Sequence, residues 1–143
     1  MTSVTRRVAG VLSILESAWV TYTQLVAAQP VCSFNLCNGS QFSPVYSPAL
    51  IVLAVILIVD GILAIWGSRV AYPAGVLLSA ILLLAMGYSA WVQSGYTYLV
   101  NWYYQDLVGA VLATTALVAN LVAWRTKNIL SEQANPMNLP VFG

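Results

Sequence analysis

Four long apolar runs constrain the fold more than any other feature of this sequence. They cover Val8–Ala28, Ala49–Trp66, Tyr72–Val92 and Leu107–Trp124. A helix needs roughly 20 apolar residues to cross the hydrocarbon core of a bilayer, and each run comes near that length. The chain of 143 residues is 60% hydrophobic and 6% charged, which is far outside the range of soluble domains. We therefore predict an all-α integral membrane protein with four transmembrane helices in an antiparallel up-down bundle.

All the cationic side chains flank the predicted helices on one side of the membrane, and they are Arg6, Arg7, Arg69, Arg125 and Lys127. Cytoplasmic segments of membrane proteins carry an excess of Lys and Arg close to the helix ends. We therefore expect a multi-pass protein of the plasma membrane with both termini in the cytoplasm. The transmembrane domain is expected over residues 1–127 and a cytoplasmic tail over residues 128–143. The loops 29–47 and 93–106 then face outward.

Cys32 and Cys37 both lie in the first outer loop, residues 29–47. Outside the membrane the compartment is usually oxidising, so a pair this close together in an irregular loop is expected to form a local disulfide. A redox-active pair is the alternative, but four residues separate the two thiols and the chain has no second pair to relay electrons. The same loop carries a sequon that begins at Asn38, which makes this residue a candidate for N-glycosylation.

The composition also excludes several classes of function. With no His and only two Cys, the chain lacks the usual ligands of zinc, haem and copper, so we expect no cofactor and no metal. Acid–base catalysis that relies on imidazole is excluded for the same reason. A net charge of +1 without a basic patch predicts no nucleic-acid partner. The expected partners are the lipid bilayer and either other membrane subunits or further copies of the chain.

Aromatic residues gather next to the predicted helix ends and suggest belts at the two headgroup levels. On the outer side they are Tyr96, Tyr98, Trp102, Tyr103 and Tyr104. On the inner side they are Trp66, Tyr72 and Trp124. We interpret all of them as membrane anchors.

Glu16 and Asp60 are the carboxylates inside the predicted helices. Each lies nine positions from an arginine, Arg7 and Arg69 respectively, so at about 1.5 Å per residue both are expected roughly 13 Å above the cytoplasmic edge. An ionised carboxylate at that depth is costly and usually has a partner, yet no Lys, Arg or His lies in any predicted helix. The partner is then a proton, a metal cation, a neutral donor or a cation of another subunit. If the two acids face each other, at least one is expected to be protonated near neutral pH.

Polar and small residues mark the faces by which these helices would pack. On the first helix, Ser13 and Thr23 share the face of Glu16. The fourth helix has a seam of small residues and one amide at spacings of four and three, namely Gly109, Ala113, Ala116, Asn120 and Ala123. Gly75 and Ser79 form a shorter version on the third helix. Such seams let membrane helices approach closely and hydrogen-bond to one another.

Two interpretations of the intramembrane acids stay open. In the first, both acids are protonated and fix the register of the bundle through hydrogen bonds to Ser79, to Asn120 or to each other. The chain is then an accessory or scaffolding subunit of a larger membrane complex, with respiratory complexes as one candidate. In the second, the acids form the proton or cation site of a small oligomeric transporter, whose candidate residues are Glu16, Asp60, Ser13, Ser79 and Asn120. An acid inside the membrane favours the transporter, whereas helices without internal breaks favour the subunit, which we predict.

The stretch Gly10–Glu16 resembles the setting of the membrane-embedded glutamate in the small multidrug-resistance transporters. That resemblance covers one helix and implies that Glu16 exchanges protons for cationic substrates. The chain departs from this family in its long outer loop and in Asp60, which has no counterpart there. An enzyme ranks third among the function classes, because only the cysteine pair offers redox chemistry, and we predict a non-enzymatic protein.

Overall fold

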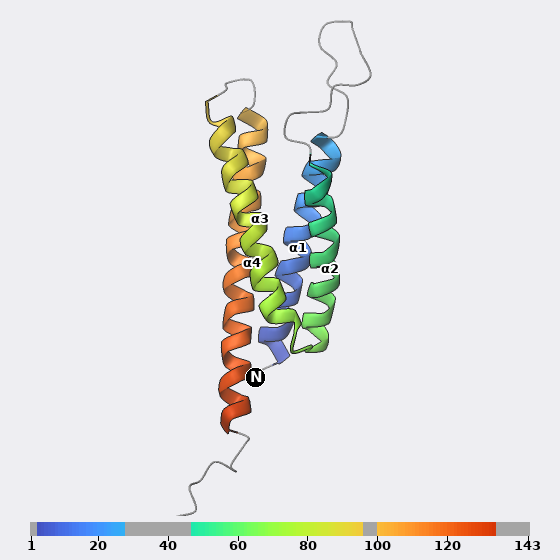
Figure 1. The fold of residues 1–143 in the computed structure, drawn as a ribbon, viewed down its shortest axis with the longest axis vertical. Coiled ribbons are helices and arrows are strands. Elements are labelled where there is room, and N and C mark those ends of the chain that lie inside the picture. The colour runs from blue at the N-terminus through green and yellow to red at the C-terminus, as the bar shows by residue number, and fades with distance from the viewer. Residues whose placement is uncertain (1–2, 28–46, 96–99, 134–143) are drawn as a thin grey trace, which may run out of the picture.

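The computed structural model describes residues 3–27, 47–95 and 100–133, and this part of the chain is helical without a strand. The helices are α1 (Ser3–Ala27), α2 (Pro48–Trp66), α3 (Ala71–Gln93) and α4 (Val100–Gln133) (Figure 1). The predicted all-helical class is confirmed for these residues. The expected disulfide of Cys32 with Cys37 and the sequon at Asn38 lie outside them and stay predictions, as do Tyr96 and Tyr98 of the outer belt.

Three of the helices are long and apolar enough to cross a membrane, over Pro48–Trp66, Ala71–Gln93 and the Tyr103–Ser131 part of α4. Helix α1 is longer than α2 and α3, but it contains more polar residues, among them Glu16 and Gln24. The hydropathy of the described helices therefore supports a membrane protein with three spans.

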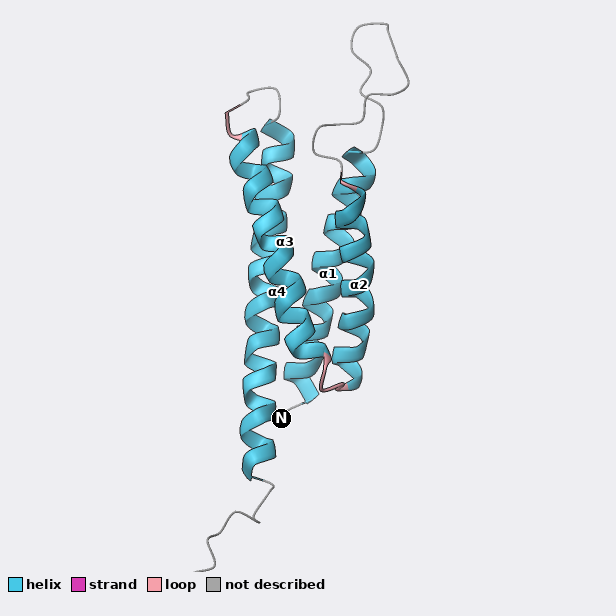
Figure 2. Cartoon of the chain, in the orientation of Figure 1, coloured by secondary structure: helices cyan, strands magenta, loops and turns pink. Residues whose placement is uncertain are grey.

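The four helices lie alongside one another in two closely packed pairs. Helix α1 packs along α2 and α3 packs along α4, while the contacts of α1 with α4 and of α2 with α3 join the pairs into one bundle. Figure 2 shows the short turn between α2 and α3 at the same end of the bundle as the start of α1. Helix α4 continues beyond that end (Figure 1).

The sequence explains where α2 begins and where it ends. Pro48 occupies the first turn of α2, where its missing N–H costs no hydrogen bond. At the other end of α2, Gly67 adopts a left-handed conformation with φ 87°, which favours glycine. The backbone N–H of Gly67 donates to Ala64 at 3.0 Å, and that of Ser68 donates to Leu63 at 2.9 Å. These bonds stop α2, and α3 begins at Ala71.

Two helices are longer than the apolar runs that predicted them. Helix α4 begins at Val100 rather than Leu107 and ends at Gln133 rather than Trp124, so the second outer loop and the tail are both shorter than expected. Helix α1 begins at Ser3 and therefore includes both N-terminal arginines. The reason is that helices end at caps and breakers, whereas apolar runs end where polar residues begin. Residues 125–133 contain neither Gly nor Pro, so the helix can continue through them.

Helices α1 and α2 approach most closely where two glycines meet. A Cβ added to Gly10 would lie 2.5 Å from the carbonyl oxygen of Gly61, and a Cβ added to Gly61 would lie 2.9 Å from the carbonyl oxygen of Gly10. The two backbones are thus in direct contact at this level, which is the kind of approach that small residues permit between membrane helices.

Two apolar layers fill much of the interior. The layer near the α2–α3 turn consists of small residues and one tyrosine, namely Ala9, Ala64, Ala71, Tyr72 and Ala123. The second layer lies toward the opposite end and consists of Val20, Ala54, Leu57, Leu82 and Met86. Tyr72 was expected in the inner aromatic belt, but it is fully buried and its hydroxyl donates to the Ala64 carbonyl at 3.1 Å. Trp66, by contrast, is exposed as an anchor would be.

Candidate functional site

Buried polar side chains from all four helices meet between the two apolar layers. We call them the polar cluster, and they are Ser13, Glu16 and Ser17 of α1, Asp60 of α2, Ser79 of α3 and Asn120 of α4. Glu16 is fully buried and Asp60 is 6% exposed. Every site residue predicted from the sequence for a proton or cation therefore lies in the interior of the bundle.

Glu16 is held by α3 across the diagonal of the bundle. The hydroxyl of Ser79 donates a hydrogen bond of 2.7 Å to Oε2 of Glu16. The other carboxyl oxygen, Oε1, is buried and has no hydrogen-bond partner among the residues that the structure describes. A buried oxygen of this kind is satisfied when it carries a proton that it can donate, or when it binds a cation or a water molecule.

Ser17, which the sequence analysis did not single out, lies beside Glu16 on the same buried face of α1. Its hydroxyl donates to the backbone carbonyl of Ala54 and so joins α1 to α2. The signal in the sequence was its position next to Glu16, at the edge of the polar face that Ser13, Glu16 and Thr23 share. A serine in a helix more often bonds within its own helix, so this position alone did not predict this contact.

Asn120 of the α4 seam bonds to α1 rather than to either acid. Its Nδ2 donates to the hydroxyl of Ser13 at 2.9 Å and to the Ala116 carbonyl at 3.0 Å. Both hydrogens of the amide are therefore used. The amide oxygen, Oδ1, is left buried and without a partner.

Gly75 creates the space in which Asp60 and Asn120 come together. A Cβ on Gly75 would lie 2.8 Å from Oδ2 of Asp60 and 2.9 Å from Oδ1 of Asn120. Both oxygens are buried and without a hydrogen-bond partner. Two buried acceptors that lie against the same glycine each need a hydrogen or a cation, and a protonated Asp60 would supply one hydrogen.

The spacing of the two acids to the arginines predicted that both lie at the same depth. The structure places them at different depths. The contacts of Gly10 with Gly61 and of Ser17 with Ala54 set the register of α1 against α2. In that register Asp60 is level with residue 11, about five residues or roughly 7 Å from Glu16. The expectation was wrong because it treated Arg7 and Arg69 as level. Arg6 is the residue that reaches the backbone at the end of α2, where it would block a Cβ on Gly67.

The small-residue seam of α4 is buried along its whole length, at Gly109, Ala113, Ala116, Asn120 and Ala123. It packs within the chain: a Cβ on Gly109 would meet Met86 of α3 at 3.2 Å and Trp19 of α1 at 3.4 Å. The polar face of α1 that Ser13, Glu16 and Thr23 share is likewise buried, and the Thr23 hydroxyl donates to the Val20 carbonyl at 2.9 Å. Both features thus serve packing inside the bundle.

A second polar contact, at the end of the bundle opposite the α2–α3 turn, was not predicted from the sequence. Nε2 of Gln93 donates to Oδ2 of Asp106 at 2.8 Å and to the hydroxyl of Ser89 at 2.7 Å. The indole of Trp19 donates to the Gln105 carbonyl at 3.0 Å, so α1 is tied to α4 at a similar level. Asp106 was placed in a loop because the apolar run begins only after it, and a residue in a loop gave no reason to expect a buried pair.

The polar cluster can hold a proton, and its oxygens are of the kind that hard cations prefer. Among the described residues, no three His, Cys, Asp or Glu side chains gather in a way that could hold a metal ion. The chain was also compared with known proteins. No protein-family model, curated protein or solved structure matches it.

Proposed function

We propose that this chain is a non-enzymatic, four-span membrane protein that serves as an accessory or scaffolding subunit of a larger membrane complex. The observation that carries the proposal is the enclosure of Glu16 and Asp60 between two apolar layers. A transport site has to open toward each side of the membrane in turn, whereas a site that holds helices together has to stay closed. Interhelical hydrogen bonds from polar side chains are a common means of fixing such a bundle.

The proposal includes α1 as the fourth span. Its residues Ser13, Glu16, Ser17, Thr23 and Gln24 are buried, while Val8, Val11, Leu15 and Leu25 point outward and are about half exposed. A helix of 25 residues is roughly 37 Å long, which exceeds the roughly 30 Å of the hydrocarbon core. A helix with apolar side chains on its outer face and polar side chains on its inner face is suited to lipid on one side and to a polar interior on the other.

The cationic end of the bundle supports a cytoplasmic location of both termini in the plasma membrane. At this end α4 extends past the α2–α3 turn (Figure 1). The extension exposes two apolar side chains, Ile129 at 56% and Leu130 at 40%. Because they lie beyond the other three helices, we propose that a neighbouring subunit covers them in the assembled complex.

Purification from native membranes in a mild detergent tests the proposal. The full chain should co-purify with larger membrane proteins at a fixed stoichiometry. The double variant Ile129→Ser, Leu130→Ser should lose most of this association, while the matched control Ile129→Val, Leu130→Ile should retain it. A chain that purifies only as a homo-oligomer would contradict the subunit proposal.

The second candidate is a small proton- or cation-coupled transporter. It is favoured by three buried oxygens without partners, on Glu16, Asp60 and Asn120, because each could accept a proton-bearing or cationic ligand. The test is flux into liposomes driven by a pH gradient. The transporter requires that Glu16→Gln abolish this flux, whereas the subunit proposal expects no such flux from the wild-type chain.

A further inference from the structure

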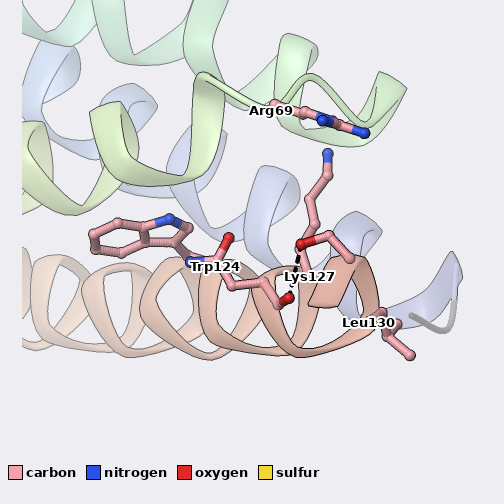
Figure 3. Close-up of a pocket in the computed structure, with 6 residues that line it drawn as sticks. Arg69, Trp124, Lys127 and Leu130 are labelled. Carbon is pink, nitrogen blue, oxygen red and sulfur yellow. Dashed lines mark hydrogen bonds between the residues drawn. The ribbon is translucent and has the colours of Figure 1, made fainter. Parts of the chain in front are cut away.

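A cavity of about 280 Å³ opens at the cationic end of the bundle, between the α2–α3 turn and the last turns of α4. Figure 3 shows its lining, which consists of Arg69, Trp124, Lys127, Asn128, Leu130 and Ser131. No residue of the polar cluster lines the cavity, and the apolar layer around Tyr72 lies between the two, so nothing in the roles proposed for Glu16 and Asp60 accounts for it. Its volume is large enough for a phosphate group and part of the molecule that carries it.

Both charged side chains among the described lining residues are cations. Arg69 and Lys127 line it, and Arg6 also lies close enough to act electrostatically on Lys127. None of the six lining residues that the structure describes is acidic. Like charges gathered in this way repel one another, and an anion placed between them would remove that repulsion.

Lys127 is held in position by the bundle itself. Its Nζ donates to the Gly67 carbonyl at 2.9 Å and lies 5.3 Å from the centroid of the Tyr72 ring. One of the three ammonium hydrogens is used by Gly67, so donors are left over for a ligand. In Figure 3 the Lys127 side chain points away from α4 and toward Arg69.

The remaining lining fits a phosphate carried on an amphiphilic or polar molecule. Trp124 and Leu130 supply an apolar wall, and the side-chain amide of Asn128 can donate hydrogen bonds. The hydroxyl of Ser131 donates to the Asn128 carbonyl at 2.7 Å, and this bond holds the last turn of the lining in place. Arg and Lys together are the side chains that most often neutralise phosphate in proteins.

We propose that this cavity binds a phosphate group, with Arg69 and Lys127 as its counter-charges and Asn128 as an additional donor. Two sources share this chemistry, the headgroup of an anionic phospholipid and a soluble phosphate ester. Leu130 also belongs to the surface proposed for a neighbouring subunit, but Arg69, Lys127 and Asn128 do not, and no residue of the polar cluster takes part, so different variants test the two proposals.

The test uses the full chain, purified in mild detergent and depleted of lipid. It is titrated with short-chain phosphatidylglycerol, short-chain phosphatidylcholine and glycerol phosphate, and binding is followed as the rise in melting temperature. We expect saturable binding of at least one of the two anionic probes. Arg69→Gln and Lys127→Gln should each weaken that binding about fivefold, since a cation near the membrane surface contributes about 1 kcal/mol. Arg125→Gln is the matched control, because Arg125 is an exposed cation of α4 that does not line the cavity.

The outcomes separate the two sources and can overturn the proposal. Saturation by phosphatidylglycerol alone assigns a lipid headgroup, and competition by glycerol phosphate assigns a soluble ester. Equal binding of phosphatidylcholine and phosphatidylglycerol, no saturable binding, or an equal loss in Arg125→Gln would each overturn it. Lys127 also ties α4 to Gly67, so if Lys127→Gln fails to fold, the exposed Arg69 decides the result alone.

Discussion

The Ser79 hydroxyl and the Glu16 carboxyl are joined by a hydrogen bond of 2.7 Å that crosses the diagonal of the bundle. Helices α1 and α3 are not among the pairs with extensive contact, so this bond is a principal link between them. Both side chains are fully buried. A hydrogen bond between membrane helices contributes about 0.6 to 2 kcal/mol, and a donor left without its acceptor costs more than the bond itself contributed.

The first prediction concerns the protonation state of Glu16. Glu16→Gln keeps an oxygen for Ser79 and has no charge, so it should change the free energy of unfolding in detergent by less than about 1 kcal/mol. Glu16→Leu removes the acceptor and should lower that free energy by about 1 to 3 kcal/mol. Denaturant titration in mixed micelles measures both. Equal losses in the two variants would show that a neutral amide cannot replace the carboxyl and would contradict the prediction.

The second prediction concerns the close approach of α1 and α2. Gly61→Ala places a methyl group 2.9 Å from the Gly10 carbonyl oxygen and from Ile14, so the helices must separate. Overpacking of this kind costs about 1 to 3 kcal/mol. Gly87→Ala is the control, because nothing lies within 4 Å of the added Cβ, and it should leave the chain equally stable or slightly more stable. The melting temperatures of the two variants give the comparison, and similar values would show that α1 and α2 do not meet at Gly61.

Much of the interior could be predicted from local sequence, because side chains on one helix face recur at a fixed angle. The 100° periodicity placed Ser13, Glu16 and Thr23 on one face, and that face is buried. The spacing of Ala113, Ala116 and Asn120 marked the buried face of α4 in the same way, since small residues are where membrane helices touch.

Relations between helices could not be predicted in this way. The relative depth of Glu16 and Asp60 depends on the contact between Gly10 and Gly61, and nothing local to either acid encodes it. Asn120 lies near Asp60, as expected, but its hydrogen-bond partner Ser13 is separated from it by 107 positions and could not be predicted. The ends of α4 were predicted wrongly because the apolar run marks only the part of a helix that suits lipid. The helix itself continues beyond this run at both ends.

The third prediction concerns the end of α3 and the beginning of α4, where Gln93 meets Asp106. Asp106 accepts a hydrogen bond from Gln93, and both side chains are buried. Gln93→Leu leaves the carboxyl without this donor and should lower stability by about 1 to 3 kcal/mol. It should also speed hydrogen exchange of the backbone amides in the first turns of α4. The double variant Gln93→Leu, Asp106→Leu removes both polar groups and should recover most of the loss, whereas an additive loss would show that the two residues do not act as a pair.

The last prediction concerns the number of spans and their direction. Four spans place the two termini on the same side of the membrane, and three place them on opposite sides. With Cys32 and Cys37 replaced by Ser, a single cysteine is introduced at Ser94, at the outer end of α3, or at Ser131 in the last turns of α4, both of which are exposed. A membrane-impermeant maleimide should label Ser94→Cys in intact cells and Ser131→Cys only after permeabilisation. An epitope tag before Met1 should likewise be reached by its antibody only after permeabilisation, because the outward apolar face of α1 suits this helix to cross the bilayer. A tag accessible from outside would show instead that α1 does not cross, and the polar cluster would then be completed by a helix that lies outside the hydrocarbon core.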